Sequence, residues 1–267
     1  VISALIITIL AALVPGCQAP DTSVPRFEKA GVLFNAPAGQ AVECGYLFVP
    51  EERDNPDSPT IKLYVATFKS HSASPKKDPI LFLAGGPGLD AVDAVSLSFE
   101  AYAPLLAERD LIVIDQRGTG YSQPSLHADE LTELAYELLG GDISPEEAES
   151  RQTAAIQGFH DRLVGQGINL AAYNSAESAA DLNDLRLALG IESWNLLGVS
   201  YGSRLALTAM RDFPAGIRSV VLDATYPLQV DLYAEVPVSA KRAFELFFNS
   251  CAADDNCSLL YPDLEDV

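Results

Sequence analysis

The sequence predicts an α/β protein with a mainly parallel sheet flanked by helices, and three observations lead to that prediction. Short, almost wholly apolar runs recur along the chain, as do strands that are buried on both faces of a parallel sheet. Segments of helical composition lie between these runs, which is the alternation that parallel crossovers produce. The 267 residues, 48% of them hydrophobic, suit one large domain but not two complete ones.

The N-terminal end predicts export. Residues 1–14 are almost entirely apolar, a run too short to span a bilayer as a helix and typical of a signal-peptide core. The segment 13–17 resembles a bacterial lipobox that would lipidate Cys17; the alternative is an ordinary secretory signal. With either signal over residues 1–17, the protein is expected in the cell envelope, the periplasm or the medium. Residues 18–40, rich in Pro, Ala and Gly, are expected to form a tether.

Two strands joined by a turn are expected next. Residues 44–49 and 60–68 are rich in β-branched and aromatic residues, and the second run alternates polar with apolar side chains. Between them, residues 54–59 read Asp-Asn-Pro-Asp-Ser-Pro, which is turn chemistry. The pair is therefore predicted to be a hairpin.

The parallel part of the sheet is predicted from Ile80 onward. Its strands are expected at four apolar runs, residues 80–83, 111–114, 194–197 and 219–222. Helices are expected at residues 98–109, 131–139, 145–164, 175–189 and 201–213. The stretch 131–167 is longer than a crossover needs and carries many carboxylates, so it is expected to be a solvated surface excursion.

The sharpest motif is Gly-Val-Ser-Tyr-Gly at residues 198–202. A predicted strand precedes it and a predicted helix follows, which is the setting of a nucleophile elbow. Glycines on both sides of the serine let strand and helix approach, so that the hydroxyl of Ser200 stands exposed at the helix N-terminus. Ser200 is therefore the candidate catalytic nucleophile; the alternative is a tight turn without chemistry.

A glycine-rich loop, residues 84–88, follows an earlier predicted strand. Acyl transfer requires two backbone N–H donors directed at the developing oxyanion. The residue after the nucleophile, Tyr201, supplies one donor, and the loop supplies the other. Gly86 is the preferred second donor, with Gly85 as the alternative, since Pro87 has no N–H.

A third motif, Asp-Gln-Arg-Gly-Thr-Gly-Tyr-Ser, occupies residues 115–122 directly after a predicted strand. Asp115 and Arg117 are expected to pair and to brace the loops around the site, which is a structural role.

The three motifs together resemble the prolyl and tripeptidyl aminopeptidase branch of the α/β-hydrolases, with matching segments over roughly residues 42–267. The resemblance implies an α/β-hydrolase core over residues 41–226 and the beginning of a helical cap over 227–267. It also implies an exported serine peptidase that acts on peptides with a free N-terminus through Ser200. Asp231 and Glu235 in the cap are candidates for binding the substrate ammonium group, the alternative being solvated surface charges.

A catalytic base is missing from the expected position. The triad of this fold runs serine, acid, histidine along the chain, yet His71, His127 and His160 all precede Ser200. All three lie in polar surroundings and are expected to be surface residues. Asp223 is a candidate acid, although a structural role is expected for it. We therefore expect the 267 residues to be an inactive fragment that lacks the triad acid and the histidine.

Cysteine content and charge limit the remaining possibilities. Cys251 and Cys257 flank a polar segment that can turn back, which predicts a local disulfide in an oxidising compartment. Cys44 is then either buried and free or bonded outside the chain. The net charge of −20 excludes nucleic acid and anionic lipid as partners, so membrane contact is expected only through an N-terminal lipid. No cluster has metal-ligand spacing, and neither metal nor cofactor is expected.

Two other functions remain compatible with these residues. A carboxylesterase would use the same nucleophile and the same oxyanion donors. A non-catalytic, surface-tethered binding protein would explain the absence of a histidine after Ser200.

Overall fold

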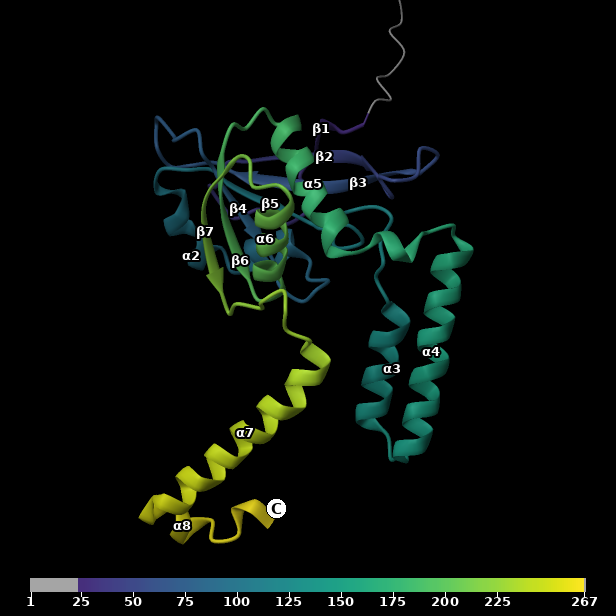
Figure 1. The fold of residues 1–267 in the computed structure, drawn as a ribbon, viewed down its shortest axis with the longest axis vertical. Coiled ribbons are helices and arrows are strands. Elements are labelled where there is room, and N and C mark those ends of the chain that lie inside the picture. Colours follow the sequence, from purple (N-terminus) through teal and green to yellow (C-terminus); the bar gives the residue numbers. More distant parts are fainter. Residues whose placement is uncertain (1–23, 267) are drawn as a thin grey trace, which may run out of the picture.

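The computed structural model describes residues 24–266, so the predicted signal segment and Cys17 lie outside the described residues. Seven strands form one mixed sheet in the order β1-β2-β3-β5-β4-β6-β7 (Figure 1). The antiparallel part comprises β1 (Arg26–Ala30), β2 (Val42–Pro50) and β3 (Thr60–Phe68). The parallel part comprises β4 (Ile80–Leu83), β5 (Leu111–Ile114), β6 (Trp194–Val199) and β7 (Ile217–Asp223). The predicted fold class is confirmed.

The N-terminal strands are partly as predicted. β2 and β3 pair antiparallel with Tyr46 opposite Tyr64, so the predicted hairpin is present. The segment expected to be a tether contains a strand, because β1 pairs antiparallel with the free edge of β2. Phe27 of β1 packs against the main apolar cluster and so connects this mostly polar strand to the core.

The strands separate two apolar layers, because successive side chains point to opposite faces. One layer, between the sheet and helices α5 (Ser175–Ala188) and α6 (Tyr201–Asp212), contains Leu81 and Ile112. The other, beneath α1 (Ala91–Leu97), contains Phe82 and Val113. Strands buried on both faces explain the uninterrupted apolar runs of the sequence.

The helix expected at residues 98–109 is instead divided. The short helix α2 (Phe99–Tyr102) is followed by a 3-10 turn, η1 (Ala103–Ala107), that carries Pro104. The proline has no N–H to continue an α-helical ladder, which accounts for the change of geometry. Helix α1 was not predicted from the sequence.

Two helical arms extend from the sheet on the side to which β7 points (Figure 1). We call α3 (Asp129–Gly140) and α4 (Pro145–Gly165) the acidic arm, and α7 (Leu232–Ala253) and α8 (Asp255–Leu260) the C-terminal arm. The 3-10 turns η2 (Leu170–Ala172) and η3 (Leu264–Asp266) follow the respective arms. No residue of α3 is buried, and Leu163 is the one buried residue of α4.

The cysteines and the sheet edge complete the architecture. A disulfide joins Cys251 to Cys257 and so links α7 to α8. Cys44 is a buried free thiol within the described residues. Strand β7 forms the last position of the sheet, pairs on one side with β6, and leaves Val221 58% exposed. Among the described helices, none has the length and hydropathy of a membrane span.

Candidate active site

Ser200 lies on a strained turn between β6 and α6. Its backbone angles, φ 54° and ψ −120°, place a residue with a side chain in a region that is normally occupied by glycine. Such a conformation costs on the order of 1–3 kcal/mol and persists only where the surroundings enforce it. The side chain is exposed at the N-terminus of α6, as the elbow interpretation predicts.

The flanking glycines are required by the close approach of strand and helix. A Cβ atom on Gly202 would lie 1.9 Å from the carbonyl oxygen of Leu83 in β4. A Cβ atom on Gly198 would lie 2.5 Å from the carbonyl oxygen of Gly202. Since real Cβ atoms do not approach other heavy atoms this closely, both positions have to be glycine for the elbow to form.

Hydrogen bonds fix the backbone of Ser200 on both sides. Its N–H donates to the carbonyl oxygen of Asp223 at the end of β7, at 2.9 Å. Its carbonyl oxygen accepts from the N–H of Ser203 at 2.9 Å and from the Ser203 hydroxyl at 2.6 Å. The same hydroxyl accepts the N–H of Tyr226 at 2.8 Å, so the elbow is fastened to the segment that leaves β7.

The glycine-rich loop lies directly against the nucleophile. A Cβ atom on Gly85 would lie 3.0 Å from Ser200 Cβ and 3.5 Å from Ser200 Oγ. Gly86 follows with φ 107°, a conformation that favours glycine. Within the described part of the chain, the N–H groups of Gly86 and Tyr201 donate no hydrogen bond. Two free amides therefore occur beside Ser200, on the two elements where the sequence predicted oxyanion donors.

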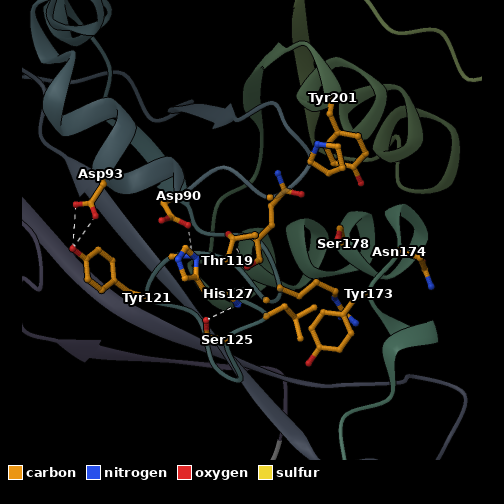
Figure 2. A pocket seen from close by; sticks show the side chains of 17 residues that line it. Asp90, Asp93, Thr119, Tyr121, Ser125, His127, Tyr173, Asn174, Ser178 and Tyr201 are labelled. Atoms are coloured by element: carbon orange, nitrogen blue, oxygen red, sulfur yellow. Dashed lines mark hydrogen bonds between the residues drawn. The ribbon is translucent and has the colours of Figure 1, made fainter. Parts of the chain in front are cut away.

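A pocket of about 450 Å³ adjoins this loop and the elbow. Its wall includes Pro87 and Gly88 of the loop and the side chain of Tyr201. Figure 2 shows Asp90, Asp93 and Tyr121 on one side and Tyr173, Asn174 and Ser178 on another. The Tyr201 hydroxyl lies 2.8 Å from the hydroxyl of Ser175 at the start of α5, which fixes the ring in the pocket wall.

Beside the pocket, Arg117 is a buried structural brace, but its partner is not the one expected. Arg117 does not pair with Asp115; it makes a bidentate ion pair with Asp181 of α5, at 2.8 Å for both contacts. Both side chains are 2% exposed, and Arg53 also contacts Asp181 at 2.7 Å. The sequence expectation was wrong about the partner because Asp181 lies 64 residues further along the chain.

Asp115 is buried and accepts backbone N–H groups instead. Its carboxylate accepts from Val92 at 3.0 Å and from Tyr121 at 2.9 Å. Burial raises the pKa of Asp115 to about 6, against the opposing effect of these two hydrogen bonds, and the charges of Asp90 and Asp93 contribute to the rise. Burial, with the hydrogen bond to Asp93, likewise raises the pKa of Tyr121 to about 12.

None of the three histidines is positioned as a base for Ser200. His71 contacts Gln40 in a surface loop, and His160 contacts its neighbour Asp161 on α4. His127 lines the pocket but is largely exposed and faces Asp129 at 3.0 Å. The hydroxyl of Ser200 makes no hydrogen bond with any described residue.

The candidate carboxylates lie apart from the pocket. Asp223 is exposed at the end of β7, where its backbone oxygen holds Ser200. Asp231 and Glu235 are exposed at the start of the C-terminal arm, and neither lines the pocket. Among residues 24–266, no group of three or more His, Cys, Asp or Glu side chains is arranged to hold a metal ion.

An exposed serine on a strained strand–helix turn, beside a glycine-rich loop, is the arrangement that the nucleophile has in serine hydrolases of this type. Residues 78–256 match the alpha/beta hydrolase fold family, and the chain belongs to that family. The fold inferred from the three motifs is thereby confirmed.

Several curated relatives of this chain carry peptidase names. Serine protease Hip1 of Mycobacterium tuberculosis is 28% identical over 219 residues, which cover 79% of this chain and 41% of that protein. Tripeptidyl aminopeptidase of Streptomyces coelicolor is 26% identical over 229 residues, which cover 82% of this chain and 41% of that protein. The chain thus spans about two fifths of the length of these relatives. Among solved structures, a proline iminopeptidase of Mycobacterium smegmatis is 20% identical with a TM-score of 0.39, over 66% of this chain and 42% of that one.

Proposed function

We propose that this chain carries the nucleophile and the oxyanion donors of an exported serine aminopeptidase. The observation that supports the proposal is the elbow itself, where Ser200 is exposed beside the free amides of Tyr201 and Gly86. The hydroxyl of Ser200 attacks the scissile carbonyl, and the two amides bind the oxygen as it becomes negatively charged. The resulting acyl-enzyme is then hydrolysed by water.

Preference for a free N-terminus is supported by relatives named tripeptidyl aminopeptidase and by the pocket next to the elbow. Asp90 and Asp93 line that pocket, where their negative potential favours a substrate ammonium group. Asp231 and Glu235, at the start of the C-terminal arm, remain further candidates for this role.

The triad acid and the histidine are proposed to come from residues other than these 267. The supporting observations are the exposed positions of the three histidines present and the length of the relatives, of which the chain spans about two fifths. The missing histidine would take the proton of Ser200 and return it to the leaving amine. The 267 residues alone are expected to show little or no turnover.

Export is proposed from residues 1–17 of the sequence alone, with lipidation of Cys17 as one form of anchoring. Radiolabelled fatty acid incorporated by the native chain, and lost in Cys17→Ala, would support the anchor. An unlabelled chain in the periplasm or medium would favour an ordinary secretory signal.

The central experiment uses the full-length protein with three substrates: a tripeptidyl arylamide, its N-acetylated form and a simple aryl ester. The free-amine arylamide is expected to be hydrolysed fastest. Ser200→Ala should lower kcat on the order of a millionfold, whereas Ser150→Ala on the exposed face of α4 should have no effect.

Other outcomes would overturn the proposal. Faster hydrolysis of the blocked arylamide or of the ester would favour another peptidase or a carboxylesterase. If the full-length protein hydrolyses none of them and no fluorophosphonate labels Ser200, a non-catalytic binding protein is the better interpretation.

A further inference from the structure

Asp115 is fully buried directly after β5 and makes four hydrogen bonds, two through its backbone and two through its carboxylate. Its own N–H donates to the carbonyl oxygen of Tyr64 in β3, and its carbonyl oxygen accepts the Ser122 hydroxyl at 2.7 Å. With the backbone fixed in this way, the carboxylate is left to accept the N–H groups of Val92 and Tyr121. The side chain therefore links two segments that are not otherwise adjacent in the chain.

The first of these segments is the helix that follows the glycine-rich loop. Helix α1 starts at Ala91, immediately after residues 85–90, and Val92 is in its first turn. Asp90 makes the reciprocal connection, because its carboxylate accepts the N–H of Gly120 at 2.8 Å. Hydrogen bonds to two carboxylates, those of Asp115 and Asp90, thus connect the start of α1 with the loop that follows β5.

We propose that Asp115 is a positioning residue. It holds the start of α1 in place and, through α1, keeps the Gly86 amide at a fixed position relative to Ser200. The inference rests on the proposed function, since it concerns the loop that supplies the second oxyanion donor. Asp115 touches neither the substrate nor the reacting atoms.

The backbone at Gly120 lies close against the carboxylate of Asp115. A Cβ atom on Gly120 would lie 2.2 Å from Asp115 Oδ2, so the adjacent backbone closes over the side chain. The ionisable groups that face Asp115 are Asp90 just before α1, Asp93 within α1, Tyr121 from its own loop and Tyr46 from β2.

The consequence for pH follows from these neighbours. The one nearby guanidinium on the same loop, that of Arg117, is paired with Asp181. Two backbone amides are therefore what stabilises the charged form of Asp115, and its pKa is raised to about 6. Protonation converts one accepting oxygen into a donor, so the link to α1 or to Tyr121 weakens in mildly acidic solution.

Hydrogen exchange of the full-length protein tests the link without relying on activity. Asn has one accepting oxygen and one donating NH2 group, so in Asp115→Asn the amide of Val92 or that of Tyr121 is expected to exchange about tenfold faster, as the loss of one hydrogen bond predicts. The β4 amides should be unchanged, and so should all amides in Glu100→Gln, a control on exposed α2. Unchanged exchange at Val92 and Tyr121, or faster exchange throughout the sheet, would overturn the proposal.

Unsubstituted protein gives a second test that does not depend on the variant folding. Corrected for the intrinsic rate, protection of Val92 or of Tyr121 should fall as pH decreases through about 6, the pKa to which Asp115 is raised. Protection that stays constant from pH 7 to 5 would contradict the inference.

Kinetics separate positioning from stability. If the catalytic histidine and Asp115 both have to be deprotonated, a plot of log kcat against pH for the unsubstituted protein has a slope approaching two on its acid side. The same plot for Asp115→Asn has a slope of one. KM should change little. Equal slopes would overturn the positioning role. If no substrate is cleaved through Ser200 while the exchange results hold, the proposed function fails but the link to α1 stands.

Discussion

The sheet around Ser200 is held by buried backbone contacts, whereas the acidic arm is almost entirely exposed to solvent. The elbow is enclosed by backbone atoms of β4 and α6 and is tied to β7 by the hydrogen bond from Ser200 to Asp223. The acidic arm has one buried residue, Leu163, and its ion pairs are exposed. The comparison teaches that the nucleophile is positioned by contacts buried in the sheet, whereas the acidic arm depends on few buried contacts. Paired substitutions in the two regions test this contrast.

The largest effect is expected where glycine is enforced by backbone contact. Gly202→Ala places a methyl group 1.9 Å from the Leu83 carbonyl oxygen. This oxygen belongs to the backbone of the central strand β4, which cannot shift to relieve the overlap. We expect a loss of more than about 4 kcal/mol, beyond the usual range of point substitutions. Gly158→Ala in α4 meets nothing within 4 Å and should stabilise the helix by up to about 1 kcal/mol. Urea denaturation monitored by circular dichroism measures both, and equal effects would remove the contrast.

Ion pairs should show the same contrast at a smaller scale. Arg117→Met leaves Asp181 buried without its bidentate partner and should cost about 3 kcal/mol or more. Arg162→Met removes an exposed pair with Glu130 at the base of the acidic arm and should cost less than about 1 kcal/mol. Denaturation midpoints of the two variants provide the measurement; a larger loss for Arg162→Met would reverse the ranking.

Asp115 near the sheet and Glu130 in the acidic arm should make the unfolding free energy change with pH in opposite directions. Because the pKa of Asp115 is raised in the fold, its contribution to stability is full below the usual carboxyl pKa and is lost as pH rises through about 6. A carboxyl pKa raised from 3.8 to about 6 corresponds to a loss of about 3 kcal/mol. Glu130 in α3 has a lowered pKa, owing first to its own backbone amide and then to Arg162, so its contribution is lost as pH falls.

Unfolding free energies from pH 4 to 7 check these signs. As pH rises, the unfolding free energy of the unsubstituted protein should fall relative to that of Asp115→Asn. Relative to that of Glu130→Gln, it should rise weakly. A difference that does not change with pH would mean that Asp115 titrates normally.

The smallest effect is expected at the nucleophile itself. Ser200→Gly relieves the positive φ of 54° and should raise stability by about 1 kcal/mol, at the lower end of backbone strain energies. Ser200→Ala keeps the strain and serves as the matched control, since both variants lack the hydroxyl. Calorimetry resolves the difference as a shift of about 2–4 °C in Tm for a domain of this size. Identical Tm values would mean that the elbow stores no strain.

The sequence predicted what is local in this protein. The buried strands and the elbow depend on short segments, so apolar runs and the glycines beside Ser200 were sufficient to place them. Strand β1 was not predicted because its polar residues pair with β2 only through tertiary structure. The start of α1 was missed for a similar reason, since Asp115 supplies its hydrogen-bond acceptor from 23 residues away. The pocket, whose wall is drawn from several separate segments, has no sequence signature.

The edge of the sheet has a practical consequence for work with this polypeptide. Strand β7 presents one side without a partner in the described structure, together with an exposed Val221. An uncovered strand of seven residues is a template on which another copy can add by backbone hydrogen bonds. Purified at high concentration, the 267 residues should therefore associate edge to edge. A charged residue at position 221 is the change that should keep them monomeric.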